Sequence, residues 1–123
     1  MSRIPVIAVI DDDDPFRTAL VESLGSLGYD ACGFASGREF LAAHAETACD
    51  CIITDIHMPD MSGLDLKKLL AAGGSNVPVI MITAHSDPAL EARATASGVT
   101  CLLRKPFESK ALIRCLAKAL NGG

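Results

Sequence analysis

The chain has 123 residues, of which 50% are apolar and 21% are charged, and its formal net charge is −4. This length and balance fit one folded domain and exclude a disordered chain. The negative charge argues against a nucleic-acid-binding surface. No apolar run approaches the roughly 20 residues that cross a bilayer, and the N-terminus lacks the apolar region of a signal peptide. We therefore expect a cytoplasmic domain without a membrane span.

Five segments along the chain predict strands, and those that are continuous apolar runs predict strands buried on both faces. They are residues 5–10, 29–34, 51–56, 78–82 and 100–103. Each run is followed by turn residues and then by a stretch with helical spacing. Five strands that alternate with five helices predict an α/β fold, in which a parallel sheet carries helices on both faces.

The helices are predicted from their start signals and their apolar spacing. Asp14-Pro15 and Asp87-Pro88 each combine an N-cap residue with proline at the first helical position. The residues expected to face the core are Phe16, Leu20, Leu24 and Leu27, then Phe40 and Leu41, then Leu66, Leu69 and Leu70, then Leu90, and finally Leu112, Cys115, Leu116 and Ala119.

The five cysteines are odd in number and scattered: Cys32, Cys49, Cys51, Cys101 and Cys115. Without a secretion signal, this pattern favours reduced thiols that serve as small apolar residues. Cys49 and Cys51 form the one close pair, but two ligands do not make a zinc site. We expect neither a disulfide nor a structural zinc ion.

Polar side chains stand where the predicted strands end. Asp11 and Asp12 follow the first strand, Asp55 lies near the end of the third, Thr83 follows the fourth, and Lys105 follows the fifth. In such sheets the ligand crevice lies beyond the carboxyl ends of the strands, where the strand order changes direction. We therefore expect these side chains to meet in one site.

The four consecutive aspartates cannot all be buried without a cation, because like charges repel. We expect Asp14 to cap the first helix and Asp13 to face solvent, which leaves Asp11 and Asp12 to point toward Asp55. Three carboxylates form a hard, oxygen-rich site suited to Mg²⁺. Beside that ion, Asp55 can act as a nucleophile toward phosphorus.

Lys105 and Thr83 would complete a phosphate-accepting site. An ammonium group and a hydroxyl offset the charge that builds up on phosphoryl oxygens. Taken singly, each residue has an ordinary explanation. Thr83 could simply end a strand, Lys105 could be a solvated charge in a loop, and Asp55 could favour a turn. Their presence together at successive strand ends favours phosphoryl chemistry.

Four segments resemble the receiver domains of two-component response regulators. They are residues 9–13, 55–59 with 62–64, 79–84, and 105–107. The resemblance covers essentially the whole chain and implies a single receiver domain over residues 1–123. It implies a flavodoxin-like, doubly wound, five-stranded parallel sheet of order 2-1-3-4-5 with five helices. The chain most resembles FixJ-type receivers, which commonly precede a helix-turn-helix DNA-binding domain.

The resemblance also implies a role for each site residue. Asp55 accepts a phosphoryl group from a histidine kinase or phosphotransfer protein, and the domain catalyses only its own phosphorylation and dephosphorylation. The implied ligands are Asp11, Asp12, Asp55 and the backbone carbonyl of His57 for Mg²⁺, and Thr83, the backbone amide of Ala84 and Lys105 for the phosphoryl group. The Lys105-Pro106 bond is expected to be cis, which sequence alone seldom indicates.

The expected switch moves Thr83 and Lys105 toward the phosphoryl group. The fourth helix, the fifth strand and the fifth helix then repack and meet an output domain or a second receiver. The fourth helix, 88–97, is rich in alanine and has little apolar anchorage, so it should be the easiest element to shift. Receivers often carry an aromatic residue in the fifth strand, where this chain has Leu102.

His57 and His85 leave two interpretations open. In the family their positions tune the lifetime of the phosphate, by shielding it or by guiding water. Exposed loop histidines without a role are the other interpretation, since loops vary.

Two other functions are compatible with parts of the same pattern. A haloacid-dehalogenase-type phosphatase also uses a strand-end aspartate, and Asp11-x-Asp13 superficially matches it. Against it, Pro15 stands where threonine or valine is usual, no acidic pair follows Lys105, and no inserted cap covers a substrate. A degenerate receiver that acts only as a binding module is opposed by the intact acidic, threonine and lysine set. The kinase, the output and the oligomeric state stay open.

Overall fold

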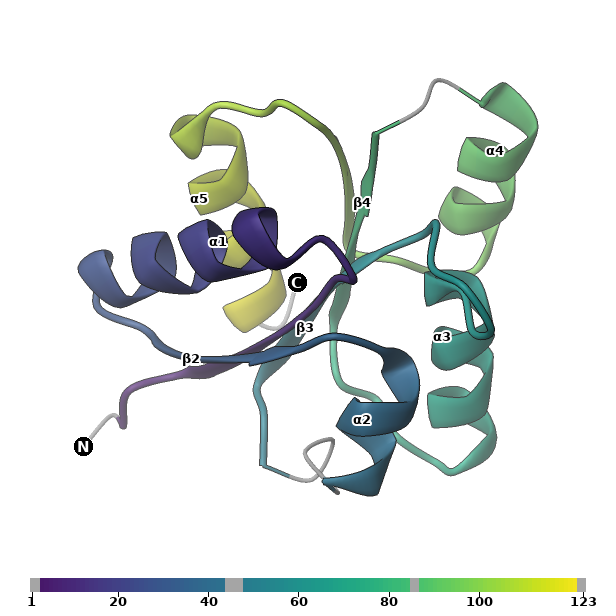
Figure 1. The fold of residues 1–123 in the computed structure, drawn as a ribbon, viewed down its shortest axis with the longest axis horizontal. Coiled ribbons are helices and arrows are strands. Elements are labelled where there is room, and N and C mark those ends of the chain that lie inside the picture. Colours follow the sequence, from purple (N-terminus) through teal and green to yellow (C-terminus); the bar gives the residue numbers. More distant parts are fainter. Residues whose placement is uncertain (1–2, 44–47, 85–86, 122–123) are drawn as a thin grey trace.

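The computed structural model describes residues 3–43, 48–84 and 87–121, along which strands and helices alternate (Figure 1). The strands are β1 Val6–Ile10, β2 Asp30–Phe34, β3 Cys51–Asp55, β4 Val79–Thr83 and β5 Cys101–Arg104. The helices are α1 Asp14–Ser26, α2 Gly37–Ala42, α3 Gly63–Ala72, α4 Pro88–Ala96 and α5 Ser109–Leu120. The predicted alternation of strand and helix is confirmed.

The strands form one parallel sheet in the order β2-β1-β3-β4-β5, which confirms the predicted fold class and strand order. Helices α1 and α5 cover one face, and α2, α3 and α4 cover the other (Figure 1). The chain leaves β1 toward β2 and later returns to the opposite side of β1 as β3. The order therefore changes direction between β1 and β3, which is the position where such sheets bind ligands.

The core lies in two layers because strand side chains alternate between the two faces of the sheet. Ile7 and Val9 of β1 pack toward α1 and α5, whereas Ala8 and Ile10 pack toward the other three helices. Every residue of β3 and β4 is buried. This burial explains why these central strands are continuous apolar runs without polar alternation.

The N-cap of α1 differs from the prediction. Asp13 caps the helix and its side chain accepts a hydrogen bond from Phe16 N at 3.2 Å, so the assignment of the cap to Asp14 was wrong. The Asp-Pro pair misled because proline fits either of the first two helical positions, where no intrahelical partner exists for an N–H. In α4 the predicted cap is confirmed, since Asp87 accepts from Leu90 N at 3.1 Å.

Two residues predicted to face the core are exposed. Leu27 is 43% exposed, and it caps the C-terminus of α1 where helical spacing no longer applies. Leu69 is 50% exposed, because it lies about 100° around α3 from its neighbour Leu70, which takes the inward position. Among the helices described, none has the length and apolar composition needed to cross a bilayer.

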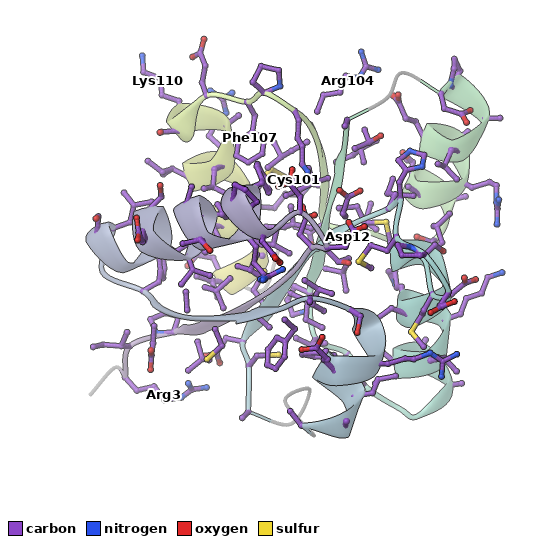
Figure 2. All side chains as sticks on the ribbon, viewed as in Figure 1. Arg3, Asp12, Cys101, Arg104, Phe107 and Lys110 are labelled. Carbon is purple, nitrogen blue, oxygen red and sulfur yellow. A yellow bond between two sulfur atoms is a disulfide. The ribbon has the colours of Figure 1, made fainter. Side chains whose placement is uncertain are left out.

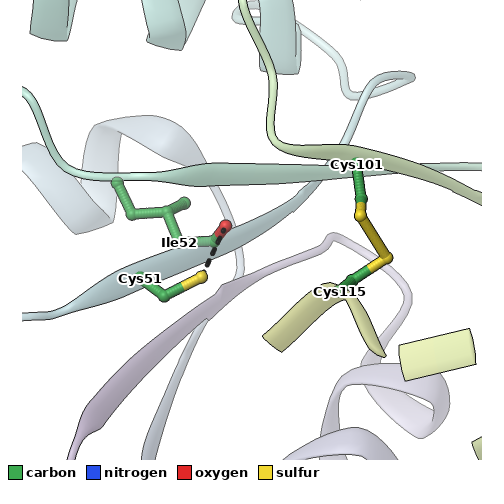
Figure 3. The surroundings of a disulfide bond; sticks show 4 residues. All are labelled: Cys51, Ile52, Cys101 and Cys115. Atoms are coloured by element: carbon green, nitrogen blue, oxygen red, sulfur yellow. Dashed lines mark hydrogen bonds between the residues drawn. A yellow bond between two sulfur atoms is a disulfide. The ribbon is translucent and has the colours of Figure 1, made fainter. Parts of the chain in front are cut away.

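The expectation that all cysteines are reduced is wrong for one pair. Cys101 of β5 and Cys115 of α5 are joined as a disulfide across a Cα–Cα distance of 5.8 Å (Figure 3). The pairing arises because α5 packs on β5 in the fold, although the two cysteines are 14 residues apart in sequence. Cys51 fits the expected apolar role: burial raises the pKa of its thiol to about 12, and it donates to the carbonyl of Ile52.

Candidate functional site

The site lies at the carboxyl edge of the three central strands and β5. Asp11 follows β1, whose last residue Ile10 pairs with Thr54, so Asp11 and Asp55 end neighbouring strands. Hydrogen bonds from Asp11 N to Phe34 O (3.1 Å) and from Lys105 N to Thr83 O (2.8 Å) continue the strand pairing to the edge. The backbone hydrogen bonds therefore fix the positions of the Cα atoms that carry these side chains.

Three carboxylates meet at this edge. Asp11, Asp12 and Asp55 each offer an oxygen that lies within 4.8 Å of the other two. Asp11 and Asp55 are buried and Asp12 is exposed, so the cluster reaches solvent through Asp12. Burial raises the pKa of the Asp11 carboxyl, and the charge of Asp55 adds to this, although hydrogen bonds from Asp13 and Lys105 oppose it.

Lys105 reaches into the cluster from the loop after β5. Its Nζ lies 3.0 Å from Asp11 Oδ2 and 3.2 Å from Asp55 Oδ2. Burial lowers the pKa of the ammonium group, but the two carboxylates outweigh it and hold the pKa above its ordinary value. The predicted cis bond between Lys105 and Pro106 is present.

The donor set fits a divalent cation. One ammonium group offsets only one of three negative charges, and the cost of burying the remaining charge calls for a further cation. All three side chains offer oxygen, which Mg²⁺ prefers, and a partly open site leaves room for the waters that it keeps. These residues fit a bound Mg²⁺ ion.

The loop after β3 orients Asp55. His57 N donates to Asp55 Oδ1 at 2.8 Å, which leaves Oδ2 to Lys105. Gly63 N then donates to Ile56 O at 3.1 Å, where α3 begins. The two carboxylate oxygens of Asp55 thus face different groups, the backbone N–H of His57 and the ammonium group of Lys105.

Thr83 and Ala84 also stand at this edge. Thr83 is buried as the last residue of β4, and Ala84 follows it at the surface. His57 is exposed, whereas His85 lies outside the described residues. Leu102 packs with the core beneath α4, so the position that is often aromatic in receivers belongs to the apolar layer here.

Sequence reasoning missed two residues at the site. Arg17 donates to Asp11 O at 2.7 Å and to Asp14 Oδ1 at 2.6 Å, and thereby ties α1 to the end of β1. Phe16 lies under Lys105, whose Nζ is 3.9 Å from the ring centroid. Phe16 was assigned to the core from its helical spacing, and the one available signal was its place in the first turn after the aspartates.

The sequence of the chain matches a known protein family. The model of the response regulator receiver domain matches residues 7–117. The chain belongs to the response-regulator receiver family. The resemblance drawn from the sequence motifs is thereby confirmed.

Two curated relatives illustrate the match between this receiver and known regulators. The chain is 36% identical over 116 residues to the response regulator protein TmoT of Ectopseudomonas mendocina. The aligned region covers 94% of this chain and 53% of the relative. It is 39% identical over 115 residues to the transcriptional regulatory protein FixJ of Azorhizobium caulinodans. The aligned region covers 94% of this chain and 54% of the relative. The receiver thus spans about half the length of these relatives.

A solved structure supports the fold of the receiver. The crystal structure of FixJ-N superposes with a TM-score of 0.88 at 30% sequence identity, and covers 98% of this chain and 96% of that chain. The likeness to FixJ-type receivers thus holds in both sequence and structure.

Proposed function

We propose that this receiver is a phosphorylation-activated switch in which Asp55 accepts a phosphoryl group with the help of Mg²⁺. The donor is a histidine kinase or a phosphotransfer protein. The observation that carries the proposal is the position of Lys105, whose ammonium group contacts both Asp55 and Asp11 inside a cluster of three carboxylates. A structural ion pair needs one carboxylate, whereas this arrangement suits the transfer of a charged group.

Asp11, Asp12, Asp55 and the backbone carbonyl of His57 would hold Mg²⁺. When bound, the ion offsets the charge of the carboxylates and of an incoming phosphoryl group. His57 lies next to the carboxylate of Asp55, since its N–H donates to Asp55 Oδ1 at 2.8 Å.

The transfer forms one bond and breaks one. A carboxylate oxygen of Asp55 bonds to phosphorus, and the bond from phosphorus to the donor breaks with its electron pair on the donor. Lys105, the Thr83 hydroxyl and the Ala84 N–H would donate to the phosphoryl oxygens, whose charge they offset. Hydrolysis returns the carboxylate, so the domain acts on its own phosphate and works as a regulator, not as an enzyme with an external substrate.

Access favours a donor that presents its phosphoryl group on a narrow projection. The Asp55 side chain is only 7% exposed, so a flat surface does not reach it. Three residues that follow the carboxyl ends of the central strands, Asp12, His57 and Ala84, are exposed. A side chain such as phosphohistidine, or a small acyl phosphate, has the required shape.

The proposed output runs through α4, β5 and α5. Of the residues of α4, only Ala94 is buried, whereas four residues of α5 are buried. An element with so little buried apolar surface has a low free energy of local opening. Movement of Thr83 and Lys105 toward the phosphoryl group would therefore shift α4 first and change the face offered to an output domain or to a second receiver.

Incubation with acetyl phosphate and Mg²⁺ tests the acceptor. Intact mass spectrometry should detect one added phosphoryl group, which is absent in Asp55→Asn and absent when a chelator removes Mg²⁺. Continuous turnover of a phosphomonoester, or phosphate on Asp55→Asn, would contradict the proposal.

Hydrogen exchange tests the output. Amide exchange in α4 should change on phosphorylation of the wild-type protein and stay constant for Asp55→Asn. An α4 that exchanges identically in both states would rule out the proposed relay.

A further inference from the structure

The ring of Phe16 lies against the ammonium group of Lys105. The distance from Nζ to the ring centroid is 3.9 Å, which is well within the range where a cation is attracted to an aromatic face. The backbone of Phe16 is fixed in the first turn of α1, where its N–H donates to the side chain of Asp13 at 3.2 Å. The contact thus joins the first turn of α1 to the loop after β5.

Phe16 also contacts the other end of that loop. Its ring meets the ring of Phe107 edge to face, with centroids 6.1 Å apart and planes at 81°. Phe107 lies two residues after Lys105 and packs at the start of α5 (Figure 2). One side chain of α1 therefore supports both the ammonium group of Lys105 and the segment that carries it.

We propose that Phe16 is the positioning residue for Lys105, which it holds in line with Asp55 during phosphoryl transfer; this inference rests on the proposed function. Lysine has a flexible four-carbon stem and does not hold its own direction. Its interactions with the two carboxylates would change with a bound Mg²⁺ ion and with esterification of Asp55. The aromatic face keeps the same charge distribution throughout these steps, so it is a constant partner for the ammonium group.

A purely structural role for Phe16 makes a different prediction. Phe16 lines an open groove of about 440 Å³ between α1 and α5, together with Leu20 and Leu112. If Phe16 only fills this region, any apolar residue of similar size serves equally well. If it positions Lys105, the residue must be aromatic.

Two substitutions separate these roles. Phe16→Leu keeps apolar volume and removes the aromatic face, whereas Phe16→Tyr keeps the aromatic face and adds one hydroxyl group. We expect Phe16→Leu to slow phosphorylation by acetyl phosphate by about 3- to 10-fold, and Phe16→Tyr to stay within about 2-fold of wild type. The affinity for Mg²⁺, measured by titration of the same proteins, should be unchanged, since the ring of Phe16 contacts Lys105 and Phe107 and the expected metal ligands are carboxylates.

A double-mutant cycle with Lys105→Met shows whether Phe16 acts through Lys105. In the Lys105→Met background, Phe16→Leu should cause no further loss of phosphorylation rate. An equal loss in both backgrounds would overturn the positioning role, as would equal rates for Phe16→Leu and wild type, or equal losses for Phe16→Tyr and Phe16→Leu.

Urea unfolding of the same four proteins reports the contact without any phosphate. Phe16→Leu should lower the unfolding midpoint more in the wild-type background than in the Lys105→Met background. Additive shifts overturn the inference about Phe16. Non-additive shifts in a chain whose wild type accepts no phosphate support the contact and overturn the proposed function alone.

Discussion

Gly63 touches the backbone of Asp55: a β-carbon on Gly63 would lie 2.6 Å from the Asp55 carbonyl oxygen. The N-terminus of α3 therefore packs directly on the residue that carries the candidate nucleophile. We predict that Gly63→Ala lowers the free energy of unfolding by about 1 to 3 kcal/mol, because the loop must shift to admit the methyl group. The same shift moves the Asp55 carboxylate, so phosphorylation by acetyl phosphate should also slow.

Gly25→Ala is the matched control for this prediction. Gly25 lies in α1, and a β-carbon there meets no atom within 4 Å. Alanine is the better helix former, so this variant should gain up to about 1 kcal/mol in urea unfolding. If Gly63→Ala unfolds at the same urea concentration as wild type, the close approach at Asp55 places no constraint on the loop.

The strand ends were predictable because the deciding signals are local. A buried parallel strand is a short apolar run, and the polar residue that ends it marks the ligand edge. Asp11, Asp55 and Lys105 could thus be assigned to one site, and the structure brings them together. The position of Lys105 between two carboxylates required the strand order, which the family resemblance supplied.

The missed features depend on how elements pack against each other. Whether Phe16 faces Lys105 depends on the rotation of α1 over the end of β1, and helical spacing gives only the apolar face. The cap at Asp13 and the exposure of Leu69 each differ from the prediction by one residue along the helix, which the sequence pattern does not resolve. The Cys101–Cys115 pair depends on the packing of α5 against β5, and the spacing of cysteines in the sequence gives no information about that packing.

The Cys101–Cys115 disulfide makes a testable contribution to stability. A cross-link across 14 residues restricts the unfolded chain and is worth up to about 3 kcal/mol. We therefore predict that a reductant lowers the urea midpoint of the wild-type protein and leaves the midpoint of Cys101→Ala unchanged. Thiol titration in denaturant should find three of the five cysteines free.

Cys32→Ala is the control, because Cys32 is exposed and outside the disulfide. Its midpoint should fall with reductant by the same amount as that of wild type. Five free thiols in protein prepared without reductant would show that the two cysteines remain unjoined in solution.

Asp50 should make the free energy of unfolding depend on pH in the acid range. Arg3 Nη1 donates to Asp50 Oδ2 at 2.8 Å and Val6 N donates to the same oxygen at 2.7 Å, so Asp50 fastens the start of β1. The hydrogen bond from Arg3 holds the pKa of Asp50 below its ordinary value of 3.8, against the opposing effect of burial. A lowered pKa in the folded state stabilises the protein above the unfolded pKa, and this contribution disappears as pH falls through the folded pKa.

The test is the pH dependence of the difference between wild type and Asp50→Asn. Urea unfolding should show the wild type as more stable above about pH 4, and the gap should narrow as the pH is lowered below that value. In the Arg3→Gln background, the stability difference between Asp50 and Asp50→Asn should be much smaller. A gap that widens toward low pH would reverse the sign and refute the argument.

Glu91 and Arg104 should restrain α4, which has the fewest buried residues of the helices described. Glu91 Oε1 lies 2.7 Å from Arg104 Nη2, and Glu91 Oε2 accepts from Asp87 N at 3.3 Å, so one carboxylate joins the start of α4 to the end of β5. Arg104 is 59% exposed, so Arg104→Gln should change the free energy of unfolding by less than about 1 kcal/mol. Local opening of α4 is more sensitive, because Ala94 is its one buried residue.

Amide exchange in α4 should therefore be faster in Arg104→Gln, while exchange in α1 and α5 stays constant. Lys110→Gln is the control, since it removes the same charge from an exposed position on α5 (Figure 2). Because Arg104 directly precedes Lys105, a shift of Lys105 toward a phosphoryl group would pull on this ion pair. Faster α4 exchange in both variants alike would trace the effect to net charge, and the ion pair would then have no part in restraining the helix.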